Sequence, residues 1–436
     1  MSLRENDDII NNNTNNPKKS ILKKRIDFFL LLVILIALVT PLISGLFAGT
    51  KIPVNNDVNL FLSAQCENFF GKELTEILIH EFEGKNPGVK IVIADGEPRP
   101  DIFIFNDGDY NELVSNGALA GLNSFTNYDS GAPQLAIPLV SFMNLLFYNI
   151  NILTDAGFDS PPKTREQFTA YARTVSRGGS GAAGAALSLN IDDHRALTRD
   201  IFSWIWAGGG DFWAESGAQQ NQNAPSFNSR SLINDIVFLE TLNREGSLAQ
   251  GIFDITGEKI VRQFAEGKIA LMIASTQVIP YLREKLGDDA FGITTIPGSG
   301  AGNYRTGLSA VYAAISAECE NAEPAWDFLV FLTEKSSLFC AELKAVPGIV
   351  SNIIPGDYVK DDPFYSKAWE IFEASQIAEG FTGKPGADKF ETIFMEELRS
   401  FFERSRTAQQ TVSAIQQRWS EVSADIEYTG DKNFLD

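Results

Sequence analysis

A run of 21 residues without a charged side chain, residues 28–48, constrains the fold of this chain more than any other feature. As a helix it would be about 31 Å long, enough to cross the hydrocarbon core of a bilayer. Five basic residues precede it closely, and such clusters stay on the cytoplasmic side of a membrane. The sequence therefore predicts a cytoplasmic tail at residues 1–27, a transmembrane segment at 28–48 and a globular remainder that is periplasmic or extracellular.

Two interpretations of this run are open, a cleaved signal peptide and a retained signal anchor. The run is longer than the roughly 7–15 apolar residues of a signal-peptide core. Leu46 and Phe47 match poorly the small residues expected before a cut after Ala48, and Cys66 is too distant for lipid attachment at the membrane. These observations favour a single-pass anchor, preceded by a disordered, asparagine-rich cytoplasmic tail.

Charge and cysteine content exclude other classes. Residues 1–27 contain 6 Lys and Arg and 4 Asp and Glu, so the rest of the chain contains 30 basic and 52 acidic side chains. A net charge near −22 opposes binding to nucleic acid, and no nucleic-acid partner is expected. Three cysteines are too few for a disulfide scaffold. We expect buried free thiols, with a Cys319–Cys340 bridge as the alternative.

Short apolar runs alternate with amphipathic segments after residue 57, which is the pattern of an α/β fold. In one amphipathic segment, Leu74, Ile77, Leu78 and Phe82 share a helical face. The predicted strands are residues 58–63, 89–94, 102–105, 269–274 and 291–296. The predicted helices are residues 71–83, 165–177 and 229–245, with a mostly helical stretch at 363–428.

Motifs of common enzyme classes are missing from the sequence. It has neither a phosphate-binding Gly-x-x-x-x-Gly-Lys loop nor a Gly-x-Ser-x-Gly nucleophile elbow. Its two histidines, His80 and His194, leave little material for a zinc site or a Ser-His-Asp triad. Adjacent acidic pairs such as Asp192 and Asp193 are expected by chance among 56 acids. We therefore expect no enzyme, catalytic residue, metal or cofactor.

Several short motifs occur in a recognisable order between residues 58 and 419. They include Pro-Asp at 100–101, Ile-Pro-Leu at 137–139, Phe-Tyr-Asn at 147–149, Pro-Pro-Lys-Thr-Arg-Glu-Gln-Phe at 161–168, Phe-Ala-Glu-Gly-Lys-Ile-Ala-Leu-Met at 264–272 and Ala-Trp-Asp-Phe-Leu at 325–329. In this order the chain resembles the bacterial extracellular solute-binding proteins of ABC importers, of the maltose-binding type. Most of these residues also have structural reasons, so the motifs identify the scaffold and not the ligand.

The resemblance implies an α/β, two-lobed periplasmic-binding-protein fold of the type II kind, with an interlobe hinge and a ligand cleft. Carried over by position, lobe one is residues 54–142 plus 308–333, and lobe two is residues 143–307 plus 334–436. The chain would cross between the lobes near residues 141–144, 305–309 and 333–335.

Candidate ligand-binding residues follow strands or lie near these crossings, because a crevice at the carboxyl ends of strands is the usual ligand site of an open α/β sheet. A sugar ring needs aromatic side chains for its C–H face and polar ones for its hydroxyls. The candidates are Phe105, Asn106, Asp107, Phe142, Trp206, Trp213, Ser275, Thr276 and Gln277. For the tryptophans and phenylalanines, burial in the core is the competing interpretation.

The predicted function is the substrate-binding component of an ATP-driven importer, which captures a small solute, above all a sugar or oligosaccharide. ABC permease subunits are the predicted protein partners, and the membrane is contacted through residues 28–48. The alternatives are a receptor for a non-sugar solute such as a polyamine, a tethered ligand sensor, and a glycoside hydrolase that uses acidic pairs of the cleft.

Overall fold

The computed structural model describes residues 58–96, 98–126, 134–213, 225–226, 229–298, 304–348 and 357–432. The predicted tail at 1–27 and the predicted transmembrane segment at 28–48 lie outside these residues. Within the part of the chain that is described, no helix is both long enough and apolar enough to span a membrane.

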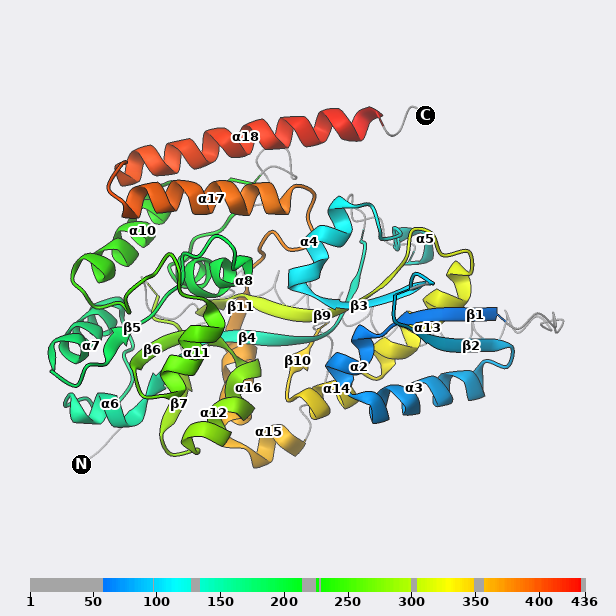
Figure 1. The fold of residues 1–436 in the computed structure, drawn as a ribbon, viewed down its shortest axis with the longest axis horizontal. Coiled ribbons are helices and arrows are strands. Elements are labelled where there is room, and N and C mark those ends of the chain that lie inside the picture. Colours follow the sequence, from blue (N-terminus) through cyan, green and yellow to red (C-terminus); the bar gives the residue numbers. More distant parts are fainter. Residues whose placement is uncertain are drawn as a thin grey trace, which may run out of the picture. The chain divides into compact units, whose positions relative to one another are not determined.

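Nine described strands join in one mixed sheet, and two short strands form a separate pair (Figure 1). The large sheet has the order β2-β1-β3-β9-β4-β6-β5, with β7 and β10 also paired to β4. The strands are β1 (Val58–Ser63), β2 (Val89–Ala94), β3 (Ile102–Asn106), β4 (Ile137–Asn149), β5 (Ala183–Ala185), β6 (Ile269–Ser275), β7 (Phe291–Thr294), β8 (Tyr304–Thr306), β9 (Leu308–Ile315), β10 (Val346–Pro347) and β11 (Ser375–Ile377).

Helices cover both faces of this sheet. They are α2 (Gln65–Phe70), α3 (Lys72–Lys85), α4 (Asp107–Ser115), α5 (Asn123–Thr126), α6 (Ile150–Asp155), α7 (Arg165–Arg177), α8 (His194–Ala196), α9 (Ser203–Ala207), α10 (Ser229–Arg244), α11 (Gly257–Ala265), α12 (Ile279–Leu286), α13 (Ala322–Glu334), α14 (Ser336–Leu343), α15 (Asp357–Asp361), α16 (Pro363–Ala374), α17 (Ala387–Phe402) and α18 (Ala408–Lys432), with a π-helix η1 (Leu197–Phe202) and a 3-10 helix η2 (Thr276–Val278).

Strand β4 joins two halves of the molecule. Its residues 137–143 pair antiparallel with β9, whereas residues 144–149 pair with β6 and β7. We call the part around β1, β2, β3 and β9 the first lobe, and the part around β5, β6 and β7 the second lobe. The predicted two-lobed α/β fold is confirmed.

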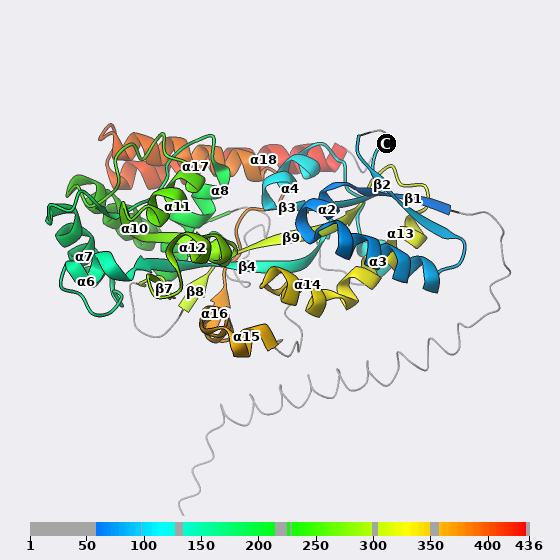
Figure 2. The ribbon, with the colours of Figure 1, turned by 60° about the horizontal axis from the view of Figure 1, so that its bottom comes forward.

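The first lobe has a core on each face of its sheet, because successive side chains of a strand point to opposite faces. Ile102 and Ile104 of β3 join the core under α2, α3, α13 and α14. Phe103 and Phe105 of the same strand join the core under α4. Figure 2 shows α3 and α14 on one side of these strands and α4 on the other.

In the second lobe, helices pack around an aromatic core. Phe202, Phe212, Phe381, Phe394 and Trp419 contact one another with ring centroids 4.4–6.1 Å apart. These rings come from η1, from the loops after α9 and β11, and from α17 and α18. Their burial holds the two long helices α17 and α18 side by side, with α18 also against α10 (Figure 1).

Two local features have a clear chemical cause: the start of helix α7 and the burial of the cysteines. Thr164 caps α7, because its hydroxyl accepts a hydrogen bond from the N–H of Gln167 at 3.2 Å. All three cysteines are free. Burial raises the pKa of the Cys66 and Cys340 thiols to about 11, so these side chains act as core residues. The alternative of a Cys319–Cys340 bridge is not realised.

Two crossings between the lobes lie against each other. At the first, Asn144 of β4 donates its backbone N–H to the carbonyl of Gly307, at 3.3 Å. At the second, the hydroxyl of Thr306 donates to the carbonyl of Asn144 at 2.7 Å. Gly307 separates β8 from β9, so both strands that pass between the lobes are hydrogen-bonded at the passage point.

The chain remains with the first lobe beyond residue 335. Phe339, Cys340 and Ala345 lie in the same core as Phe328 and Leu332, and β10 pairs with residues 140–141 of β4. Helix α16 then packs in a core of the second lobe. The predicted division assigns residues 334–436 to lobe two, whereas α14 and β10 pack with lobe one.

Candidate functional site

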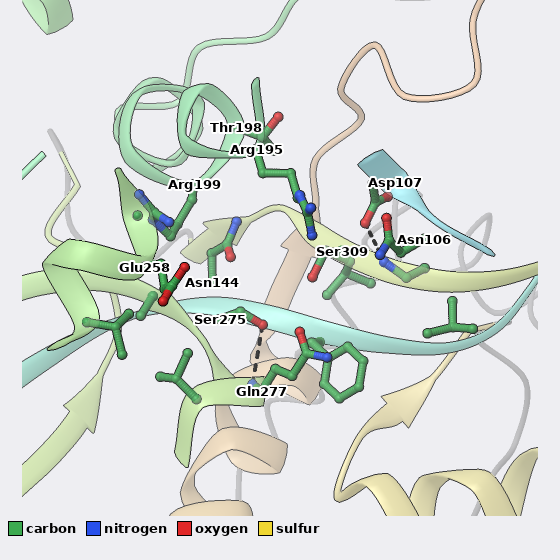
Figure 3. Close-up of a pocket in the computed structure, with 18 of the residues that line it drawn as sticks. Asn106, Asp107, Asn144, Arg195, Thr198, Arg199, Glu258, Ser275, Gln277 and Ser309 are labelled. Carbon is green, nitrogen blue, oxygen red and sulfur yellow. Dashed lines mark hydrogen bonds between the residues drawn. The ribbon is translucent and has the colours of Figure 1, made fainter. Parts of the chain in front are cut away.

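A cleft of about 690 Å³ lies where β4 and β9 pass between the lobes (Figure 3). Its walls come from the end of β3 and the start of β9 in the first lobe, and from α8, η1, α11 and the end of β6 in the second. The polar side chains labelled there are Asn106, Asp107, Asn144, Arg195, Thr198, Arg199, Glu258, Ser275, Gln277 and Ser309.

The first-lobe wall is built where β3 turns into α4. Asn106 caps α4, since its side-chain oxygen accepts a hydrogen bond from the N–H of Gly108 at 2.8 Å. The carboxylate of the next residue, Asp107, accepts from the N–H of Ala310 at 2.8 Å and from the hydroxyl of Tyr312 at 3.0 Å. Burial raises the pKa of Asp107 to about 6, although these two donors and the charge of Arg195 favour its ionised form.

The second-lobe wall is built at the end of β6. Ser275 accepts a hydrogen bond from the N–H of Gln277 at 3.3 Å and so starts the 3-10 turn η2. The exposed Gln277 side chain lines the cleft. Thr276 is buried instead, and its hydroxyl accepts from the N–H of Met143 at 3.2 Å. The serine and the glutamine therefore face the solvent of the cleft, whereas the threonine ties β6 to the crossing strand.

Three arginines line the cleft, and two of them have carboxylate partners. Arg199 binds Asp200 through two hydrogen bonds, of 2.5 and 2.6 Å. Arg262 binds the exposed carboxylate of Glu258 at 2.5 Å, one helical turn away. The side chain of Arg195 is exposed in the cleft, and no hydrogen bond or ion pair is found for it among the described residues.

The structure brings five of the nine predicted site residues to this cleft: Asn106, Asp107, Phe142, Ser275 and Gln277. The other four do not line it. Phe105 points to the opposite core and packs on Tyr110 and Tyr312, with ring centroids 5.2 and 5.7 Å away. Thr276 is the buried hydroxyl described above.

The two predicted tryptophans belong to the second-lobe core. Trp206 is 1% exposed and packs against the crossing at Gly307, where a Cβ would come within 2.2 Å of its ring. The ring of Trp213 packs on Phe381 and lies under the ammonium group of Lys384, at 4.3 Å. Neither tryptophan contacts the cleft in this structure.

Among the cleft residues that the sequence did not predict, three bear most directly on the ligand. The aromatic rings of Phe69, on α2, and Tyr281, on α12, line the cleft from opposite lobes, and Tyr281 is 37% exposed. Arg195 is the third. Tyr281 lies one helical turn after Gln277, and this spacing from a predicted site residue was the one signal available for it.

The chemistry offered by these residues is hydrogen bonding and ring contact. Among the described residues, no cluster of histidine, cysteine, aspartate and glutamate could hold a metal ion. The cleft instead combines hydroxyls, charged groups and the side-chain amides of Asn106, Asn144 and Gln277 with the aromatic rings of Phe69, Phe142 and Tyr281.

Residues 72–337 match the family model of the bacterial extracellular solute-binding proteins. An ABC transporter-binding protein of Deinococcus radiodurans is 20% identical over 254 residues, which cover 56% of this chain and 59% of that protein. A binding protein of Brucella abortus is 19% identical over 201 residues, 46% of each chain. This chain thus spans about half the length of the curated relatives it matches.

Solved structures share the fold at low sequence identity. The cyclic alpha-maltosyl-1,6-maltose binding protein of Arthrobacter globiformis superposes with a TM-score of 0.68 at 17% identity, covering 85% of this chain and 100% of that one. UgpB of Mycobacterium tuberculosis, in complex with glycerophosphocholine, gives a TM-score of 0.65 at 18% identity, covering 85% and 99%.

Proposed function

The chain belongs to the bacterial extracellular solute-binding proteins, and on this premise we propose that it binds a small carbohydrate in the cleft between its lobes. The observation that carries the proposal is the lining of the cleft. Phe69 and Tyr281 offer rings from opposite lobes, while Asn106, Asn144 and Gln277 offer amides. Rings suit the C–H face of a sugar and amides suit its hydroxyls. A volume of about 690 Å³ is also within the usual range for small-molecule sites.

Cleft chemistry distinguishes this proposal from its rivals. A polyamine would meet the guanidinium group of Arg195, which has no carboxylate partner among the described residues, and this positive charge opposes a cationic solute. A glycoside hydrolase would need two free carboxyl groups. Asp107 is held by two hydrogen-bond donors, and Glu258 is paired with Arg262. A bound sugar that reaches both walls would favour the closed arrangement of the lobes by its differential affinity.

The proposed role is to deliver this solute to the permease subunits of an ATP-driven importer. We propose that residues 28–48 keep the chain at the cytoplasmic membrane, with residues 58–432 outside it. The uncharged run behind a basic cluster supports this topology. N-terminal sequencing of the cellular protein tests it: a mature chain that begins near Gly49 would show cleavage and remove the anchor.

The ligand assignment is tested by calorimetry on the purified full chain with a panel of neutral and charged sugars and with spermidine. A sugar at 100 times its dissociation constant should also raise the free energy of unfolding by about 2.7 kcal/mol. Gln277→Ala should weaken sugar binding, because it removes an exposed amide of the cleft. Gln417→Ala, at an exposed position of α18, is the matched control. Binding of spermidine without any sugar would contradict the proposal.

A further inference from the structure

The charges that line the cleft do not balance. Of the three arginines, Arg199 and Arg262 each have a carboxylate partner. Of the carboxylates, Glu258 is paired with Arg262, and Asp107 accepts hydrogen bonds from Ala310 and Tyr312. Arg195 alone among these groups has neither a hydrogen bond nor an ion pair within the described residues.

The position of Arg195 makes its guanidinium available to a bound molecule. The residue lies on α8 in the second lobe, and its side chain extends across the cleft toward the start of α4 in the first lobe (Figure 3). Its Nε lies 3.2 Å from the point where a Cβ of Gly108 would lie, and the side-chain oxygen of Asn106 lies 3.0 Å from the same point. The guanidinium therefore sits beside an amide that can bind a hydroxyl.

Because the net charge of the whole protein is negative, the positive charge of Arg195 is informative about the ligand. The chain carries a net charge of −20, which repels anions at long range. An exposed arginine in the cleft supplies a local attraction that the surrounding field does not. Arginine also presents its N–H donors in a planar fork that matches a carboxylate or a phosphate through two parallel hydrogen bonds.

We propose that the solute is an anionic carbohydrate, whose carboxylate or phosphate group is bound by Arg195 while Asn106 and the neighbouring Ser309 bind its hydroxyls. This inference rests on the proposed function and narrows its ligand class. The charge of Arg195 acts on the Asp107 carboxylate, but both oxygens of that carboxylate already accept hydrogen bonds, from Ala310 and Tyr312. The outer N–H donors of Arg195 therefore remain for the ligand.

The test compares matched sugars on the purified full chain by calorimetry. D-glucuronate is set against D-glucose, D-galacturonate against D-galactose, and D-glucose 6-phosphate forms the phosphate arm. We expect at least one anionic sugar to bind about tenfold or more tightly than its neutral counterpart. Its affinity should also fall as salt is raised, because the attraction is electrostatic. The arm that binds identifies carboxylate or phosphate as the recognised group.

Two variants make the assignment specific to Arg195. Arg195→Gln keeps a polar side chain at an exposed position. It should weaken binding of the anionic sugar by about 10–100-fold, with little effect on binding of a neutral one. Arg177→Gln, at an exposed arginine ending α7 outside the cleft, should change neither.

Other results would separate this inference from the proposed function. If neutral sugars bind as tightly as anionic ones, and Arg195→Gln leaves both unchanged, the anionic assignment is wrong and carbohydrate binding stands. If no sugar of either charge binds, both proposals are wrong.

Discussion

The side-chain oxygen of Asn111 accepts a hydrogen bond from the backbone N–H of Gly383 at 2.9 Å, although 272 positions separate the two residues. Asn111 lies on α4 of the first lobe, and Gly383 lies in the loop before α17 of the second. Gly383 has a φ of +76°, and a Cβ there would come within 2.4 Å of the Tyr110 ring. The neighbouring Thr382 lines the cleft. This contact therefore joins the lobes at the edge of the cleft.

We predict that Asn111→Ala shifts the unliganded protein toward an open arrangement of the lobes. A typical hydrogen bond contributes about 1 kcal/mol, which corresponds to roughly a fivefold change in the ratio of open to closed molecules. Small-angle scattering should report a larger radius of gyration than for the wild type. Asn116→Ala, at an exposed position just after α4, is the control. An unchanged radius in Asn111→Ala would show that this contact does not hold the lobes together.

Trp206→Ala is expected to destabilise the protein, since the ring is 1% exposed and fills the space beside Gly307. Truncation of a buried tryptophan typically lowers the free energy of unfolding by about 3–5 kcal/mol. Urea denaturation should show a large loss for Trp206→Ala and a smaller one for Trp206→Phe. If Trp206→Ala instead keeps the wild-type denaturation midpoint but binds ligand more weakly, Trp206 contacts the ligand in the cleft, as the sequence predicts.

Tyr281→Ala should weaken ligand binding while leaving the fold intact, because the ring is 37% exposed and lines the cleft. Loss of ring contact and of apolar burial should reduce the binding free energy by about 1–3 kcal/mol. Calorimetry with the sugar that binds best measures this directly. Tyr304→Ala removes a ring of similar exposure, 44%, that does not line the cleft, and its affinity should match the wild type. Equal losses in both variants would contradict the assignment.

The free energy of unfolding should fall as the pH rises from about 5 to 8, because of Glu391. This residue is 4% exposed, and burial, helped by the charges of Asp388 and Asp107, raises its pKa from 4.5 to about 8. A carboxyl whose pKa is higher when folded binds its proton preferentially in the folded state. Its stabilising contribution is complete below the ordinary pKa and is lost as the pH approaches 8.

Glu391→Gln should therefore flatten the pH dependence of stability in this window, by on the order of 1 kcal/mol per pH unit. Urea denaturation at several pH values provides the comparison with the wild type. Glu373→Gln, at an exposed glutamate of α16, should retain the wild-type slope. A wild-type slope in Glu391→Gln would mean that the Glu391 carboxyl is already ionised near neutral pH.

The sequence pattern predicted secondary structure well where residues close together in the chain determine it. Strands β1 and β2 and helix α7 begin and end at the predicted residues. In α7 the reason is visible, because Thr164 supplies the capping hydroxyl and the apolar face follows at helical spacing. Ile77 shows the limit of the same reasoning: it shares the apolar face of α3, yet it is 53% exposed, since the neighbouring elements cover Leu78 and Phe82 and leave its edge of the helix open.

Most of the predicted site residues that line the cleft lie at the ends of strands. Asn106 and Ser275 end strands β3 and β6, Asp107 and Gln277 follow closely, and the structure brings all four to one cleft. The tryptophans could not be assigned in this way. A tryptophan beside a glycine-rich turn has the same local pattern whether it faces a cleft or a core.

By itself, the sequence determined the α/β class, most of the strands and helices, and the family, because these depend on spacing and composition along the chain. Only the tertiary structure decided that Trp206 packs inward against Gly307, that Arg195 reaches the start of α4, and that Asn111 meets Gly383. Each of these contacts joins residues more than 85 positions apart. Such contacts are selected by the packing of whole lobes against each other, which no local window of sequence encodes.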